Sequence, residues 1–314
     1  MNTAPSQKLP AARAELVNDN YFGTAVSDPY RWMEQSEHQP ELNSWMRSQG
    51  QHARQTLDQL ADREAFIQRL QQLMGAAVSV RSLIVAGEYR FFLKTEKNAQ
   101  LAKLMVRDAQ GNERVLVDPA EVEKGGRSHR AIDNFSPSMD GRFVAYNLSG
   151  GGGEIGEVRF IETATGKLLP DVLERIWGEF EVHFTLDNSG VFYTQMEKEA
   201  FTNPKLDKLQ NMQAFYHRLG TPSSADVHIL GNRGGAIPFS SEEFPLVYTF
   251  KGTNWVIALG RVARAERRLV VAKLSEINGD KTPWRVIAEY QDKLNNFAVH
   301  GDTLYYISTQ DAPY

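Results

Sequence analysis

The first part of the chain carries apolar residues at helical spacing. Between residues 38 and 75, apolar side chains recur every three or four positions, with polar residues between them. Asp62 stands where the amino-terminal cap of a second helix is expected, and Gly75 stands where that helix should stop. The pattern therefore predicts two consecutive amphipathic helices. Their apolar positions are Leu42, Trp45, Met46, Leu57 and Leu60 in the first helix, and Phe66, Ile67, Leu70 and Leu73 in the second.

From residue 76 onward, the spacing of apolar positions changes to a period of two, which is typical of strands. Gly, Asn and Asp residues separate the short apolar runs, and such residues favour turns between antiparallel strands. A weak repeat accompanies this pattern, because a glycine precedes an aromatic or β-branched run about every 50 residues, a spacing typical of β-propellers. A β-sandwich also has closely spaced strands, but the regular repeat favours a propeller. The repeated glycines are Gly87, Gly141, Gly190, Gly252 and Gly301.

The composition excludes several classes of site and of partner. There are no cysteines, which rules out disulfides, thiolate metal sites and cysteine nucleophiles. The 35 basic and 39 acidic residues are interspersed along the 314-residue chain, so no surface is obviously built for nucleic acid or for a membrane. Residues 1–20 hold no apolar run of signal-peptide length, and no window approaches a membrane span. We therefore expect a cytoplasmic protein, or a periplasmic one if the true start carries a leader.

Candidate catalytic and ligand-binding motifs are scarce. A serine hydrolase of the α/β type needs the run Gly-x-Ser-x-Gly, and the sequence has none. The glycines at residues 150–153 are followed by Glu154 rather than by Lys and Ser or Thr, which favours a flexible hairpin over a phosphate-binding loop. The histidines form neither His-x-His nor His-Glu-x-x-His, so we predict no metal site and no cofactor. They are His38, His52, His129, His183, His217, His228 and His300.

Residues 28–34 read Asp-Pro-Tyr-Arg-Trp-Met-Glu, and this run is the most specific motif in the chain. It resembles the amino-terminal signature of the prolyl oligopeptidase family of serine peptidases, in which Leu takes the place of Met33. Met keeps the volume and apolarity of Leu at that position. Weaker resemblances follow in order along nearly the whole chain, at residues 135–141, 148–157, 216–221 and 309–313. The signature residues, for which we predict a structural role, are Asp28, Pro29, Tyr30, Arg31, Trp32 and Glu34.

The resemblance implies a fold and a partner domain. It implies a mainly β chain, an incomplete β-propeller of about four to five blades of the seven-bladed prolyl oligopeptidase type, preceded by a helical segment. The predicted domains are the helical segment over residues 1–75 and the incomplete propeller over residues 76–314, with the catalytic α/β-hydrolase domain absent. In the family, the first segment wraps around that hydrolase half. An aromatic residue near Trp177 reaches toward the substrate there, so Trp177 is our substrate-facing candidate, although its local sequence favours core or rim packing.

Two interpretations of the function stay open. In the first, the complete enzyme hydrolyses short peptides after proline, or after basic residues as in the related oligopeptidase B branch, through a Ser–His–Asp triad that this chain lacks. The propeller would restrict access to short, unstructured peptides, and this chain alone would be inactive. In the second, the chain is a closed, non-catalytic binding module, or a subunit that pairs with a separate hydrolase half. We expect a truncated chain, because the predicted strand at residues 304–307 would be the first strand of a fifth blade and lacks its hairpin partner.

Overall fold

The computed structural model describes residues 9–74, 77–122 and 130–311. The chain forms two compact units, Met1–Ala77 and Val78–Tyr314. The predicted domain boundary after residue 75 lies close to this division. That the two units are separate domains stays a prediction. The expectations for Gly75, His129 and residues 312–313 lie outside the described residues.

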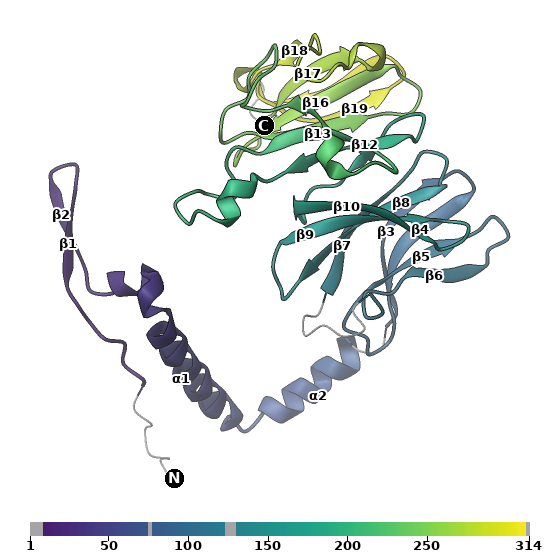
Figure 1. Cartoon of the computed structure of the whole chain (residues 1–314). Coiled ribbons are helices and arrows are strands. Elements are labelled where there is room, and N and C mark those ends of the chain that lie inside the picture. Colours follow the sequence, from purple (N-terminus) through teal and green to yellow (C-terminus); the bar gives the residue numbers. More distant parts are fainter. Residues whose placement is uncertain (1–8, 75–76, 123–129, 312–314) are drawn as a thin grey trace. The chain divides into compact units, whose positions relative to one another are not determined.

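The amino-terminal unit consists of a hairpin, two short helical turns and two α-helices (Figure 1). Both helices predicted from the apolar spacing are confirmed, and Asp62 lies directly before the second, where its carbonyl accepts the amide of Phe66 at 3.0 Å. Neither helix contains a buried residue within the described part of the chain. The elements are β1 (Val17–Tyr21), β2 (Thr24–Asp28), η1 (Arg31–Glu34), η2 (Ser36–His38), α1 (Gln39–Asp58) and α2 (Arg63–Met74).

The described residues of the carboxy-terminal unit form four sheets of four strands and one sheet of two strands. In each four-stranded sheet the strands follow chain order and pair antiparallel. The predicted mainly β fold with an incomplete propeller is therefore confirmed. The first two sheets are β3 (Ser79–Ala86), β4 (Tyr89–Thr95), β5 (Lys103–Arg107) and β6 (Glu113–Val117), then β7 (Arg130–Pro137), β8 (Phe143–Gly150), β9 (Ile155–Glu162) and β10 (Leu168–Trp177).

The next two sheets have the same plan, with short helical turns in their connections. The third is β11 (His183–Phe184), β12 (Gly190–Gln195), β13 (Gln213–Arg218) and β14 (Val227–Leu230), with η3 (Lys198–Phe201) and η4 (Ser223–Ala225) between strands. The fourth is β15 (Phe244–Thr249), β16 (Trp255–Arg261), β17 (Arg268–Lys273) and β18 (Arg285–Ala288), with η5 (Leu274–Glu276) after β17. The turn η6 (Tyr290–Asp292) then leads to the fifth sheet, β19 (Leu294–His300) and β20 (Thr303–Ser308).

The repeated glycines occupy equivalent places in the five sheets. Four lie in the turn between the first and second strands of a sheet, and Gly190 begins the second strand of the third sheet. Two of these turns also touch each other, because a Cβ on Gly87 would meet the carbonyl of Asp140, and a Cβ on Gly141 would meet the carbonyl of Ala86. Both glycines have positive φ angles, 57° and 75°. The repeat in the sequence therefore marks the blades themselves.

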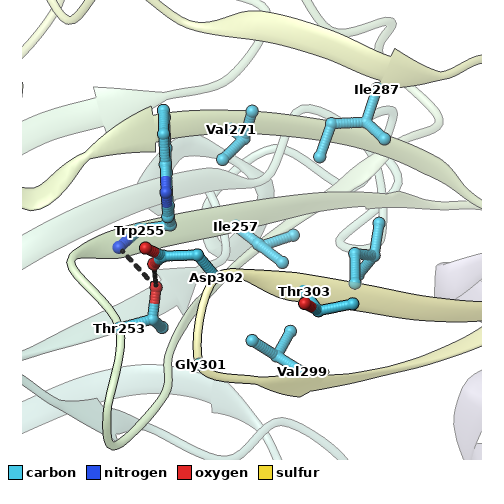
Figure 2. A pocket seen from close by; sticks show the side chains of 10 residues that line it. Thr253, Trp255, Ile257, Val271, Ile287, Val299, Gly301, Asp302 and Thr303 are labelled. Carbon is cyan, nitrogen blue, oxygen red and sulfur yellow. Dashed lines mark hydrogen bonds between the residues drawn. The ribbon is translucent and has the colours of Figure 1, made fainter.

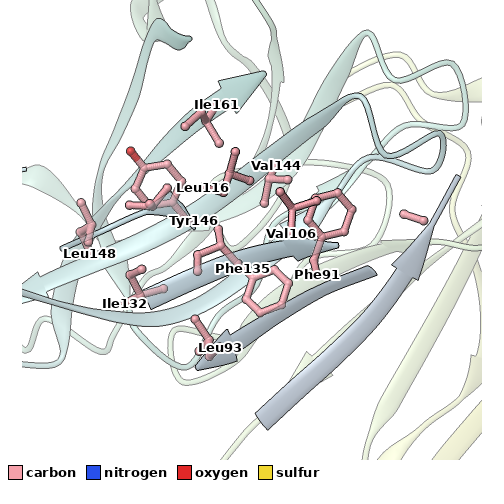
Figure 3. Packing of buried hydrophobic residues seen from close by; sticks show 13 residues of the cluster. Phe91, Leu93, Val106, Leu116, Ile132, Phe135, Val144, Tyr146, Leu148 and Ile161 are labelled. Atoms are coloured by element: carbon pink, nitrogen blue, oxygen red, sulfur yellow. The ribbon is translucent and has the colours of Figure 1, made fainter. Parts of the chain in front are cut away.

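In the middle sheets, alternate residues of a strand pack against the sheets on either side. Tyr146 faces the first sheet, whereas Ala145 packs with residues of the third sheet. Figure 3 shows the cluster between the first two sheets, in which Phe91, Leu93 and Val106 contact side chains of β7 and β8. This two-sided packing explains why the second strands are apolar almost throughout and are buried in the first four sheets.

The fifth sheet corrects one prediction. Residues 304–307 do form a strand, as part of β20, but β20 is the second strand of its sheet because β19 precedes and pairs with it. The pattern of β19 is interrupted by Asn295 and Asn296, which concealed the strand. Figure 2 shows side chains that line a cleft between this sheet and the fourth one. The cleft has a volume of about 170 Å³, and Thr253 donates to Asp302 there at 2.8 Å. Apolar side chains of both sheets line the cleft, including Ile257, Val271, Val299 and Leu304.

The meander gives each sheet two distinct ends. The turns between first and second strands lie at one end. The connection from each fourth strand to the next sheet starts at the other end, beside the turns between second and third strands. We call this second end the crossover face. It includes the hairpin at residues 151–154, the connections at residues 178–182 and 231–243, and the long loop at residues 196–212.

Candidate functional site

The first candidate residues, those of the signature, hold the β1–β2 hairpin to the helical turn that follows it. Asp28 accepts the backbone amide of Tyr30 at 2.8 Å and contacts Arg31 Nε at 3.0 Å. Arg31 also reaches Asp19 of β1 at 2.5 Å and Glu34 at 3.7 Å. The amide of Tyr30, and then Arg31, hold the pKa of Asp28 below its ordinary value.

Trp32 is the buried centre of this arrangement, with only 3% of its surface exposed. Its Nε1 donates to the carbonyl of Arg13 at 2.7 Å, and the Arg13 guanidinium lies 4.8 Å from the indole ring centre. Pro29 takes part through its carbonyl, which accepts the amide of Glu15 at 2.9 Å. These contacts fit the structural role predicted for the signature, which stays a prediction until its residues are varied.

The substrate-facing candidate, Trp177, ends β10 at the crossover face. Its Nε1 donates to Glu154 Oε2 at 3.3 Å, across the hairpin that joins β8 to β9. Its ring packs against Phe180 and Phe244, with centroids 5.2 and 5.5 Å away. The indole is only partly buried, so one part of it packs in the rim while another part stays accessible. Trp177 can therefore pack in the rim and still contact a substrate, and its role as a substrate-facing residue stays a prediction.

No pattern in the sequence indicated which residues would lie beside Trp177. Phe180 lies in the connection to the third sheet and Phe244 begins the fourth, so the three rings meet only through the order of the sheets. Glu179 lies in the same connection, and its carboxylate is 3.7 Å from Arg261 Nη2. The result is an aromatic platform edged by carboxylates. Such a platform can hold an apolar or prolyl side chain of a peptide by stacking and leave charged groups for its backbone ends.

The long loop at residues 196–212 adds polar groups to the crossover face. Glu197 forms an ion pair with Arg233 of the next connection. Burial raises the pKa of Glu197, and its Oε1 has no hydrogen-bond partner in the described part of the chain. Asn232 donates to Asn211 at the other end of the loop. These contacts tie the loop to the connection between the third and fourth sheets.

Metal sites and serine hydrolases use particular arrangements of His, Asp and Glu side chains. No cluster of three or more such side chains among the described residues is arranged to hold a metal ion. The histidine best placed beside carboxylates, His217, contacts Asp226 and Asp171 through both ring nitrogens, which leaves no nitrogen to activate a serine. No described helix is both long and apolar enough to cross a membrane.

Comparison with known proteins gives a consistent result over almost the whole chain. The family model "Prolyl oligopeptidase, N-terminal beta-propeller domain" matches residues 10–313. The prolyl endopeptidase of Elizabethkingia meningoseptica is 26% identical over 98% of this chain, and prolyl oligopeptidase A of Galerina marginata is 23% identical over the same share. The chain spans 41% of the length of the first relative and 45% of the second, less than half of each.

A solved structure shows the same fold. Prolyl oligopeptidase B of Galerina marginata, bound to a 35mer hydrolysis and macrocyclization substrate, matches 98% of this chain with a TM-score of 0.75 and 20% identity. The match covers 44% of that protein. The predicted resemblance is thus confirmed, and the chain belongs to the prolyl oligopeptidase family, whose amino-terminal β-propeller region it represents.

Proposed function

We propose that this chain is the access-controlling part of a prolyl oligopeptidase-like serine endopeptidase. The complete enzyme would hydrolyse short peptides on the carboxyl side of proline, with its Ser, His and Asp supplied by an α/β-hydrolase half. The main support for this proposal is the family match over residues 10–313, together with relatives that are named prolyl endopeptidases. A cytoplasmic location is part of this proposal.

Two surfaces support a partner domain. The helices α1 and α2 expose large apolar side chains, including Met46, Phe66 and Leu70, which a hydrolase half would cover. The crossover face presents Trp177 beside Glu154, where a peptide could be held before it reaches the hydrolase. In this proposal, Trp177 stacks on a substrate side chain and Phe180 and Phe244 fix the orientation of its ring.

The binding-module alternative receives less support. A closed module requires the last strand to complete the first sheet, whereas β20 pairs with β19 alone among the described strands. The version with a separate hydrolase subunit is compatible with the same surfaces. The two versions differ only in whether one or two polypeptides carry the halves.

The gene that encodes this chain provides the first test. We expect the same or an adjacent reading frame to encode Gly-x-Ser-x-Gly followed by the Asp and His of the triad. A locus without any such sequence would overturn the proposal. This chain alone should not hydrolyse a proline-containing chromogenic peptide, and hydrolysis that a serine-directed reagent abolishes would contradict the assignment of the triad to the other half.

Trp177 can be tested in the complete enzyme. Trp177→Ala should raise KM for a short proline peptide about tenfold with little change in kcat, because lost stacking weakens substrate binding by about 1.4 kcal/mol. Trp255→Ala is the matched control, since Trp255 begins β16 at the opposite end of its sheet. Equal kinetics for the two variants would remove Trp177 from the substrate path.

A further inference from the structure

A buried histidine lies between two carboxylates at the seam of the second and third sheets. His217 of β13 contacts Asp226 Oδ1 through Nδ1 at 2.7 Å and Asp171 Oδ1 through Nε2 at 3.0 Å. Asp171 belongs to β10 of the second sheet, His217 belongs to β13 of the third, and Asp226 directly precedes β14 of the third. All three side chains are at most 2% exposed. The cluster therefore joins two blades through groups that water does not reach.

The surroundings make both carboxylates hydrogen-bond acceptors. Tyr193 of β12 donates its hydroxyl to Asp226 Oδ2 at 2.7 Å. The amide of Gly220 donates to Asp171 Oδ1 at 2.6 Å, the same oxygen that faces His217. The ring of Phe160, from β9, stacks on the imidazole at 6.0 Å. Asp171 Oδ2 is buried without a hydrogen-bond partner in the described residues, so this carboxylate depends on His217 and Gly220.

The protonated form of His217 fits this arrangement. A neutral imidazole has one N–H donor and would turn a lone pair toward one of the two carboxylates. An imidazolium donates to both. Two other titratable groups face the cluster. Tyr193 donates to Asp226, and the positive charge of Arg175 acts on the hydroxyl of Tyr193. Neither of them donates to Asp171, so the proton on His217 Nε2 joins the amide of Gly220 in linking Asp171 to the third sheet.

We propose that Asp171, His217 and Asp226 form a pH-sensitive latch, which holds the second and third sheets together while His217 is protonated and lets the seam loosen when it loses its proton. The latch stands apart from the proposed peptidase function, since it needs only the two sheets. It has a consequence for that function, because Asp171 and Trp177 lie on the same strand, β10. Loosening the seam would release the strand that positions Trp177.

The direction of the pH effect follows from the surroundings of His217. Burial alone would lower the pKa of His217, but the hydrogen bonds and attraction of Asp226 and then Asp171 raise it above its ordinary value of 6.5. The folded protein therefore holds this proton more tightly than the unfolded chain does. The stabilisation is complete below pH 6.5, decreases as the pH rises above it, and is lost once the pH passes the folded-state pKa.

Nuclear magnetic resonance of the wild-type chain with ¹⁵N-labelled histidine tests the protonation directly. We expect both ring nitrogens of His217 to carry protons at pH 6, and one of them to be lost only above the ordinary histidine pKa of 6.5. A neutral imidazole at His217 at pH 6 would overturn the latch, whatever the variants show.

Hydrogen exchange of the β10 and β13 amides tests the coupling to the seam. After correction for intrinsic exchange rates, protection at the seam should fall as the pH rises from 6 to 9, because the stabilisation supplied by the proton on His217 is lost over the upper part of that range. His217→Gln should abolish this pH dependence, while the control His300→Gln should keep it. A wild-type seam whose protection does not change with pH, or an unchanged dependence in His217→Gln, would overturn the proposal. If His217→Gln does not fold, Asp171→Asn serves as the second variant and should weaken the pH dependence, because Asp226 alone then favours the proton on His217.

Discussion

The two units use apolar residues in opposite ways. In the carboxy-terminal unit, neighbouring sheets cover one another and Phe91 of β4 is completely buried, whereas β3 and β20 in the first and last sheets expose Val85 and Ile307. In the amino-terminal unit, α1 and α2 have no buried residue, and Phe66 of α2 is 70% exposed. Both patterns were visible in the sequence as regular apolar spacing. The comparison shows that such spacing identifies the face of an element, whereas burial depends on which other elements are available to cover it.

The largest difference between the units should appear in core truncations. Phe160→Ala removes a fully buried ring that contacts Phe184 edge-on at 6.3 Å, and should lower the free energy of unfolding by about 3–5 kcal/mol. The matched variant Phe66→Ala should change it by less than about 0.5 kcal/mol, because its ring is already exposed. Urea unfolding followed by circular dichroism measures both. Equal losses would mean that α2 is covered in solution.

Replacing one turn glycine in each unit should give losses of stability smaller than those of the core truncation. Gly87 and Gly23 both lie in hairpin turns with positive φ, 57° and 89°. Ala at Gly87 would strain the backbone and push into the carbonyl of Asp140, so we expect a loss of more than about 2 kcal/mol. Ala at Gly23 meets no atom within 4 Å and should cost only about 1 kcal/mol. Calorimetric melting can compare them, and a larger loss at Gly23 would contradict this account.

Trp32 is buried, unlike the residues of α1 and α2 in the same unit. Changing it should have a small effect on stability. Trp32→Phe keeps most of the ring but removes the hydrogen bond to the carbonyl of Arg13, which should cost about 1 kcal/mol. Hydrogen exchange around residues 13–34 should increase accordingly. Tyr30→Phe is the control, since the Tyr30 side chain is largely exposed. Faster exchange in the control than in Trp32→Phe would show that the signature does not act through Trp32.

Substitutions of exposed apolar residues on α2 should have the smallest effect on stability but a measurable effect on association. Replacing both Phe66 and Leu70 by Glu should leave the free energy of unfolding nearly unchanged and reduce light scattering, because less apolar surface is exposed. Arg69→Glu alters charge on the same helix without removing apolar area, and should leave scattering high. If scattering falls equally in both cases, charge rather than apolar surface controls association.

The sequence predicted the features that depend on neighbours along the chain. The blades were predictable because Gly87 and Gly141 hold backbone angles that other residues rarely adopt, so each turn leaves a mark in the sequence. The strand β19 was not predictable, since Asn295 and Asn296 break its alternation and its pairing with β20 decides its structure.

The cluster around His217 and the cluster around Trp177 could not be predicted from the sequence, for a different reason. Asp171 and His217 are 46 residues apart, and only the packing of β10 against the third sheet brings their side chains together. Trp177 likewise meets Phe180 and Phe244 through the succession of three sheets. No local spacing encodes such contacts, because the distance between blades depends on all the side chains that separate them.

The meander order of the sheets has a consequence for the synthesis of the protein. Within the carboxy-terminal unit, every described sheet pairs only strands that follow one another in the chain. Such local pairing shortens the loops that must close during folding, which favours fast formation. The first sheet, residues 79–117, can therefore assemble as it leaves the ribosome, before His217 has been translated. The blades would then be added one at a time, in the order in which the ribosome makes them.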